Sequence, residues 1–161
     1  SGKKLQYFDP ELGESYVPYV VETSIGLDRM FLTVLSHAFR EEKLENGESR
    51  VVLKIPAHLA PIKAAILPLT KKDRMPEKAR EIMKSLQIDF NCQYEEKDSI
   101  GKRYRRQDSI GTAFCITVDH QTLEDNTVTI RDRDTMEQER VSVAKLHSII
   151  AEKVNIAKYL V

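Results

Sequence analysis

The fold is decided between residues 62 and 95, which read IKAAILPLTKKDRMPEKAREIMKSLQIDFNCQYE. The apolar run at 62–69 predicts a strand, and residues 90–95 predict a second one. Pro76 suits the first position of the helix between them, because its missing N–H would have no partner there. A strand, a helix and a strand in this order favour parallel pairing with a right-handed crossover. The apolar stripe of that helix consists of Ala79, Ile82, Met83 and Leu86.

Three further strands are predicted around this unit. Residues 51–53 form a short apolar run before it. After it, apolar and polar residues alternate at 114–118 and again at 128–130, with a polar turn at 120–126 between them. Two alternating runs joined by a short turn predict an antiparallel hairpin. The five strands would therefore form a mixed sheet.

Two more helices complete the predicted domain. The basic segment 99–109 is followed by Gly111, a residue typical of the position just past a helix end. Ser142 can cap a final helix. The fold class is thus α/β, with a mixed sheet of about five strands flanked by about three helices. The stripe of the last helix consists of Val143, Leu146, Ile149, Ile150 and Val154.

A separate piece precedes this domain. The first fifteen residues are polar and predict a loop, whereas the apolar run 17–21 predicts a buried strand. An amphipathic helix is predicted over 26–42, and the polar turn 45–49 ends the piece. The predicted domains are residues 1–45 and residues 46–161.

Composition excludes several classes of protein. The chain has 161 residues with 25 Lys+Arg against 25 Asp+Glu, so it is not a histone-like polycation. It contains no apolar stretch of about 18 residues, which a membrane span needs, and no visible signal peptide. Cys92 and Cys115 lie far apart, without a C-x-x-C pair or a His cluster. We therefore expect a cytoplasmic protein with free thiols, no bound metal and no membrane contact.

The sharpest chemistry lies at the junction between the predicted strand at 17–21 and the helix that follows. Glu22 and Ser24 share a strand face, and Arg29 falls in the first helical turn. A carboxylate can hold an ammonium group, and a guanidinium at a helix start can hold a phosphate. The alternative is structural: Glu22 caps the helix, and Arg29 pairs with Asp28 or Glu22 on the surface. A third possibility is a generic phosphate-binding module at 22–29.

Residues 18–29, PYVVETSIGLDR, resemble the third signature motif of class II aminoacyl-tRNA synthetases, and more closely its glycyl-tRNA synthetase version. The resemblance implies that Arg29 binds the γ-phosphate of ATP. It also implies that Glu22 and Ser24 line the glycine pocket. Thr23 stands where many members of the family have proline, a departure that leaves the implied roles in place.

Three other segments resemble the same family. Residues 56–69 are similar to the opening of the anticodon-binding domain shared by the glycyl, histidyl, threonyl and prolyl enzymes. Residues 99–111 and 129–135 resemble segments specific to the glycyl enzyme. The resemblance covers nearly the whole chain. It implies a remnant of the catalytic domain followed by a complete anticodon-binding domain.

The resemblance implies contact with the anticodon arm of tRNA(Gly), whose anticodon ends in two cytosines. Basic residues interleaved with an aromatic can pair with phosphates and stack on bases, and carboxylates can accept from the cytosine amine. The alternative is that the Arg–Asp alternation at 131–134 belongs to a salt-bridged strand on the surface. The predicted tRNA-binding residues are Lys102, Arg103, Tyr104, Arg106, Asp108, Arg131 and Arg133.

The first two class II motifs are not found in the chain, and Phe39-Arg40-Glu41-Glu42 matches the second only by chance. We therefore expect a C-terminal fragment that binds tRNA but cannot activate glycine. The intact enzyme would use ATP with Mg²⁺ and form a homodimer, whereas the fragment would bind no cofactor. The alternative function is a non-catalytic accessory or interaction protein that reuses the anticodon-binding type of domain.

Overall fold

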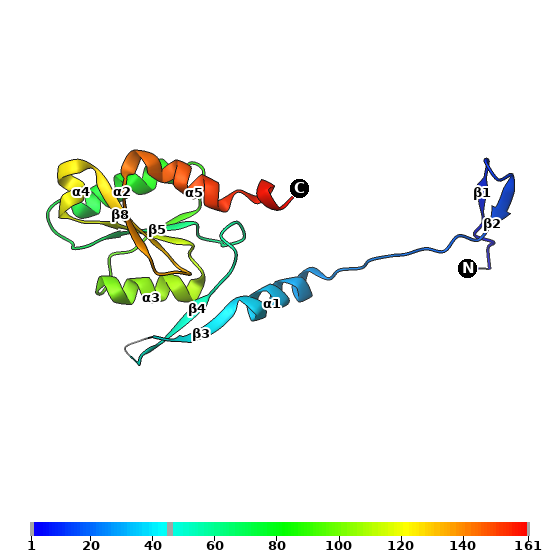
Figure 1. The fold of residues 1–161 in the computed structure, drawn as a ribbon, viewed down its shortest axis with the longest axis horizontal. Coiled ribbons are helices and arrows are strands. Elements are labelled where there is room, and N and C mark those ends of the chain that lie inside the picture. The colour runs from blue at the N-terminus through cyan, green and yellow to red at the C-terminus, as the bar shows by residue number, and fades with distance from the viewer. Residues whose placement is uncertain (1, 45–46, 161) are drawn as a thin grey trace. The chain divides into compact units, whose positions relative to one another are not determined.

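The structure, a computed structural model, describes residues 2–44 and 47–160. The chain divides into two compact units, Ser1–Phe31 and Leu32–Val161, called here the N-terminal and C-terminal units (Figure 1). The predicted domain boundary between residues 45 and 46 falls outside the described residues, and it stays a prediction.

The C-terminal unit is built on a five-stranded mixed sheet in the order β6-β5-β7-β8-β9. β5 pairs in parallel with both β6 and β7, whereas β8 pairs antiparallel with its two neighbours. The predicted β-α-β unit and hairpin are thus confirmed. The strands are β5 (Ala64–Pro68), β6 (Cys92–Tyr94), β7 (Phe114–Val118), β8 (Thr127–Asp132) and β9 (Gln138–Ser142).

Helices cover both faces of this sheet (Figure 1). α2 (Met75–Leu86) and α5 (Leu146–Val154) pack on one face around the main apolar core, which includes Ile66, Ile116 and Val128. α3 (Ile100–Ile110) packs on the other face, over Ala65 and Leu67. Because β5 and β7 are buried along their whole length, both faces need a cover.

Two helix boundaries follow the predicted signals. Pro76 lies in the first turn of α2. α3 ends at Gly111, whose φ of 81° is left-handed and whose N–H donates to the carbonyl oxygens of Gln107 and Asp108. A Cβ at Gly111 would lie 3.1 Å from the Leu53 carbonyl oxygen, so both backbone angle and space favour glycine there.

The predicted turn at 120–126 is a short helix, α4 (His120–Asp125). Asp119 and Thr122 form a capping box at its start, and this local hydrogen bonding turns the polar segment into a helix.

The final helix also begins differently from the prediction. Ser142 makes no capping hydrogen bond, and a 3₁₀ turn, η1 (Val143–Lys145), separates it from α5.

The predicted count of five strands in the sheet is right, but one member is wrong. β4 (Ser49–Leu53) does not join the sheet and pairs instead with β3 (Phe39–Lys43). The fifth strand of the sheet is β9, which the sequence analysis did not predict. Backbone pairing with β8 and the buried Val141 hold this strand in the sheet. Arg140 adds a hydrogen bond to Thr127 Oγ1 over 2.6 Å and an ion pair with Asp119.

The helix predicted over 26–42 is also too long, because α1 (Leu27–Ala38) gives way to β3. Antiparallel hydrogen bonds to β4 satisfy the backbone of 39–43 in place of helical ones. The Lys54 N–H donates to the Ala38 carbonyl oxygen over 2.7 Å, which ties the end of α1 to the residue after β4.

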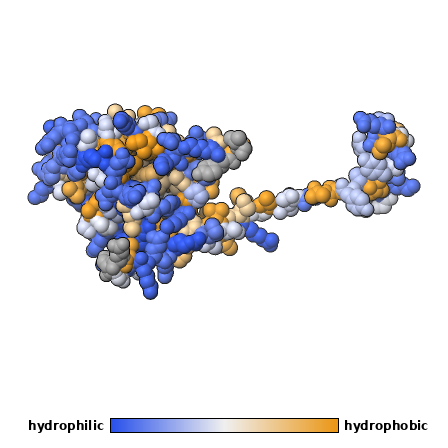
Figure 2. Space-filling view, in the orientation of Figure 1, coloured by the Kyte–Doolittle hydropathy of each residue, from blue (hydrophilic) through white to orange (hydrophobic). Residues whose placement is uncertain are grey.

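The N-terminal unit departs most from the prediction. The expected loop contains a small hairpin, β1 (Tyr7–Asp9) with β2 (Glu14–Tyr16), closed by an edge-on contact between Tyr7 and Tyr16. The strand predicted at 17–21 is absent from the described residues. An extended segment becomes a strand only when a neighbour pairs with its backbone, and here the apolar side chains stay exposed (Figure 2).

The chain ends in a short 3₁₀ helix, η2 (Ile156–Tyr159). Among the described residues, no helix has both the length and the apolar composition to cross a membrane.

Replacing Gly111 tests the packing between α3 and β4. Gly111→Ala should lower the free energy of unfolding by about 1 kcal/mol or more, because the positive φ strains an L-residue and the new methyl meets Leu53. Urea unfolding followed by circular dichroism measures the change. Gly101→Ala is the matched control: Gly101 lies inside α3, and a methyl group added there would have nothing within 4 Å, so alanine should be neutral or stabilising. Equal effects of the two substitutions would contradict this account.

Candidate nucleic-acid interface

Helix α3 carries the basic segment, and it lies on the sheet mainly through polar side chains. Its buried residues are Arg103, Gln107 and Asp108. The apolar contribution is small, since Ile100 and Tyr104 are only partly buried. Polar groups taken out of water must find partners within the protein, and these partners determine the position of the helix.

Arg103 holds the carboxyl ends of two parallel strands. Its Nη1 donates to the Pro68 carbonyl oxygen over 2.6 Å and to the Glu95 carbonyl oxygen over 3.3 Å, and Nη2 donates to Leu69. Only 2% of the residue is exposed, and burial lowers the pKa of its guanidinium. Arg103 thus joins α3 to the loops that follow β5 and β6.

Asp108 is the acceptor at the centre of a buried ion cluster. Arg131 binds it in a bidentate manner, donating to Oδ1 over 2.8 Å and to Oδ2 over 3.1 Å. The same Oδ2 also accepts from Arg50 Nη1 over 3.1 Å. The guanidinium of Arg131 lies 4.8 Å from the centre of the Tyr104 ring, and the Tyr104 hydroxyl contacts Thr117 over 2.6 Å. The Arg50–Asp108–Arg131 cluster is named the buried ion cluster below.

Arg133 is also buried, and its contacts are mainly to the backbone. It donates to the Gly111 carbonyl oxygen over 2.9 Å and to the Ile55 carbonyl oxygen over 2.7 Å, and it pairs with Asp134. Ion pairs therefore form, but not on the surface as that alternative expects, because Arg131 and Arg133 are buried. Arg131 pairs with Asp108 of α3 and not with its strand neighbour Asp132.

The other basic residues of α3 lie nearer the surface. Arg106 pairs with Glu95 and Asp98. Lys102 is exposed and Arg105 partly exposed, and no ion pair is found for either among the described residues. Of the cations on α3, these two are therefore the most available to an external anion.

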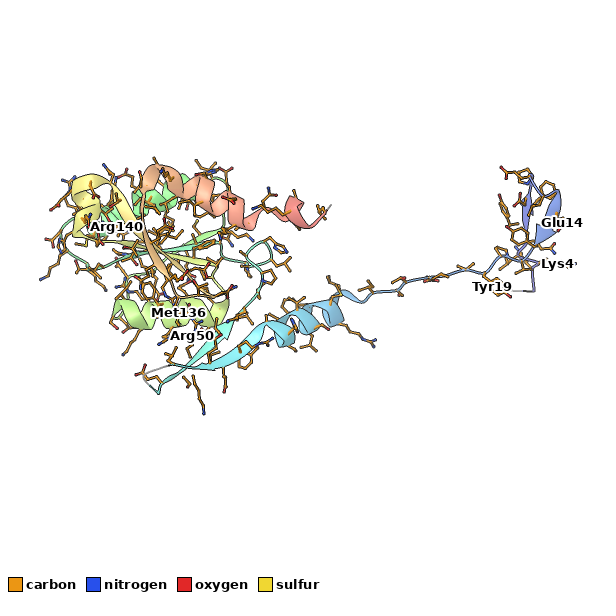
Figure 3. The ribbon with its side chains drawn as sticks, in the orientation of Figure 1. Lys4, Glu14, Tyr19, Arg50, Met136 and Arg140 are labelled. Atoms are coloured by element: carbon orange, nitrogen blue, oxygen red, sulfur yellow. The ribbon has the colours of Figure 1, made fainter. Side chains whose placement is uncertain are left out.

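A hollow of about 420 Å³ lies between α3, the end of β8 and the β8–β9 turn. Three cations and an aromatic ring contribute to it, and Arg131 closes its inner side. Figure 3 shows Met136 beside α3, and Met136 is one of the residues that line the hollow. The lining residues are Glu48, Gly101, Lys102, Tyr104, Arg105, Arg131, Met136 and Gln138.

The predicted tRNA-binding residues thus form two groups. Lys102, Tyr104 and Arg106 present at least part of their side chains to solvent. Arg103, Asp108, Arg131 and Arg133 are almost fully buried among protein partners. Direct contact of any of them with tRNA stays a prediction. Sequence reasoning missed Arg50, whose one signal was a cation directly before the apolar run Val51-Val52-Leu53.

The predicted ATP and glycine residues lie in the N-terminal unit. Arg29 falls in the first turn of α1, as expected. Glu22 and Ser24 lie in the exposed, extended segment before that helix. Their roles toward ATP and glycine remain predictions.

The thiols are unreactive in character. Burial raises the pKa of Cys115 to about 12 and that of Cys92 to about 11, so both stay protonated at neutral pH. No group of three or more His, Cys, Asp or Glu side chains in the described part of the chain could hold a metal ion.

The family model described as "Anticodon binding domain" matches residues 63–153, more than half of the chain. The chain belongs to this family.

Curated relatives agree with this membership. The glycine–tRNA ligase of Clostridium tetani is 54% identical over 154 residues, covering 96% of this chain and 33% of that protein. The glycine–tRNA ligase of Chlorobaculum tepidum is 53% identical over 154 residues, which again cover 96% of this chain and 33% of that protein. The chain thus spans about a third of the length of the curated relatives it matches. The RNA binding domain of threonyl-tRNA synthetase from Cryptosporidium parvum has a TM-score of 0.57 at 22% identity, covering 62% of this chain and 25% of that one, which supports the fold alone.

Replacing Asp108 tests the buried ion cluster. Asp108→Asn should lower the free energy of unfolding by about 3 to 5 kcal/mol, because two buried guanidinium groups lose their shared counter-charge. Chemical denaturation measures the loss. The control is Glu81→Gln on α2, where the carboxylate is exposed and pairs with the neighbouring Lys78, so the expected loss is below about 1 kcal/mol. A loss of similar size in both variants would refute the structural role of Asp108.

Proposed function

We propose that the chain is the C-terminal part of a glycine–tRNA ligase and that its anticodon binding domain binds the anticodon arm of tRNA(Gly). The observation that carries the proposal is identity above 50% to glycine–tRNA ligases over 96% of the chain. Because the match covers almost the whole chain, it includes the candidate RNA surface on α3 as well as the segment 18–29 with its predicted ATP and glycine residues.

The proposed RNA surface is the hollow beside α3. Proteins that read RNA sequence usually take up unstacked bases from single-stranded loops. The Tyr104 ring offers a stacking surface, and Lys102 and Arg105 can neutralise the phosphates beside a bound base. Cytosine has acceptors that a guanidinium can satisfy and an amine that the Gln138 or Glu48 side chain can accept from. The hollow therefore supplies the groups that recognition of a cytosine requires.

The buried members of the predicted set support this surface from below. Arg103 and Arg133 hold α3 against neighbouring backbone, and Asp108 orients Arg131 beneath the Tyr104 ring. A recognition site benefits from such a rigid frame, because less freedom is lost when the RNA binds.

In the intact enzyme, we propose that a glycine carboxylate attacks ATP to give glycyl-adenylate and pyrophosphate, and that tRNA then takes the glycyl group with release of AMP. Arg29 would hold the γ-phosphate of ATP, while Glu22 and Ser24 would hold the glycine ammonium group. Mg²⁺ would accompany ATP as its counter-ion. The intact enzyme is proposed to be a cytoplasmic homodimer.

Anticodon binding is tested with the 161-residue chain and a fluorescent stem-loop of the tRNA(Gly) anticodon arm. Replacing either anticodon cytosine by uracil should weaken binding about tenfold, because the exocyclic amine contacts are lost. Lys102→Met combined with Arg105→Met should weaken binding of the cognate stem-loop by a similar factor. Lys84→Met is the control, since Lys84 is exposed on α2, which covers the opposite face of the sheet. Equal affinity for all stem-loops would overturn the proposal.

The same chain should produce no glycyl-adenylate. ATP–pyrophosphate exchange with glycine provides the assay. Exchange above that of a protein-free blank would contradict the proposal that this chain by itself does not activate glycine.

A further inference from the structure

Arg50 connects three elements that lie far apart in sequence. Its side chain is fully buried. Nε donates to Glu42 Oε2 of β3 over 2.7 Å, and Nη1 donates both to Asp108 Oδ2 of α3 and to the Arg133 carbonyl oxygen, each over 3.1 Å. Figure 3 shows Arg50 between β4 and α3. A single guanidinium thus links the β3–β4 hairpin to α3 and to the chain just after β8.

The hairpin is in turn continuous with α1. β3 follows Ala38, the last residue of α1, without a loop, and Lys54 N–H donates back to the Ala38 carbonyl oxygen. Glu42 also pairs with Lys54, and hydrogen bonds from Lys54 and Arg50 lower the pKa of its carboxyl despite partial burial. The C-terminal half of α1, β3, β4 and the Arg50 side chain therefore form one continuous set of contacts that ends at Asp108.

α3 also packs directly against β4, and Gly111 just past its end lies beside Leu53. Within this contact Arg50 supplies the buried charged link, whereas the apolar patch beneath the helix is small. Arginine suits the position because its planar fork can donate in several fixed directions at once, whereas lysine offers a single point charge.

We propose that Arg50 is a positioning residue that couples the β3–β4 hairpin and the C-terminal half of α1 to the RNA-facing helix α3. The part that concerns RNA rests on the proposed function. RNA bound beside Tyr104 and Lys102 restrains α3. The contact between Asp108 of α3 and Arg50 of β4 then transmits that restraint to the hairpin. The restraint then reaches the C-terminal half of α1, residues 32–38. Coupling of this kind requires only that ordering one element lowers the free-energy cost of ordering the neighbouring element.

Hydrogen exchange measured by mass spectrometry on the full 161-residue chain tests the coupling without RNA. Arg50→Met should speed amide exchange about tenfold or more in both α3 and the β3–β4 hairpin, since opening either element no longer breaks the buried ion pair that joins them. The matched control is Arg140→Met, which removes another arginine with a carboxylate partner, Asp119, on a different part of the sheet. It should speed exchange near β9 and leave the hairpin unchanged.

Adding the anticodon stem-loop gives a second readout that a merely structural role would not produce. In the wild-type chain, RNA should slow exchange in α3, in the hairpin and in residues 32–38. In Arg50→Met, RNA at saturating concentration should slow exchange in α3 alone. If Arg50→Met does not fold, Arg50→Lys takes its place, because it keeps the buried charge but loses the fork.

The outcomes separate the two proposals. Absence of RNA binding to the wild-type chain would overturn the proposed function, while the ligand-free coupling would still be decided by Arg50→Met. If RNA slows amide exchange in α3 of the wild-type chain but not in the hairpin, the proposed transmission of the RNA restraint from α3 to the hairpin would be overturned. Unchanged hairpin exchange in Arg50→Met or Arg50→Lys would overturn the coupling itself.

Discussion

The buried carboxylate of Asp108 is the group around which the α3 side of this domain is arranged. It lies between two guanidinium groups, one from β4 and one from β8, in a part of the protein where water cannot screen the charges. Asp108 accepts both from Arg131, which lies against the Tyr104 ring, and from Arg50 of the β3–β4 hairpin, so it joins α3 to the sheet and to the hairpin.

The two faces of the sheet are therefore stabilised in different ways. α2 and α5 cover their face through a large apolar core, which supplies hydrophobic stability without strict direction. α3 covers the other face through buried charges and hydrogen bonds, which contribute little net stability but are satisfied in only one arrangement. This division suits a domain that must hold one face rigid for recognition. The visible surface of the C-terminal unit is mostly hydrophilic (Figure 2), consistent with recognition by polar contacts.

The sequence predicted what depends on apolar periodicity and on turn chemistry. The β-α-β unit at 62–95 and the end of α3 at Gly111 follow from such signals. β9 was missed because Gln-Glu-Arg-Val-Ser has no apolar alternation. Its position depends on backbone pairing with β8, on a single buried apolar residue, Val141, and on polar contacts of Arg140. The face of α3 toward the sheet was also hidden. Ile100, Arg103, Tyr104, Gln107 and Asp108 have the spacing of a buried helix face, but three of the five are polar, so the pattern looked like a solvated helix.

The central claim is that buried cations of α3 build the frame while surface cations bind the RNA. The salt dependence of anticodon stem-loop binding tests it most directly, because its slope reports the number of phosphates that the protein neutralises. Lys102→Met should reduce the slope of log Kd against log salt by roughly 0.7, the value for one phosphate contact with a single strand. Arg103→Met should lower the stability of the chain and leave the slope of the folded protein unchanged. A slope reduced by Arg103→Met and unaffected by Lys102→Met would contradict the account.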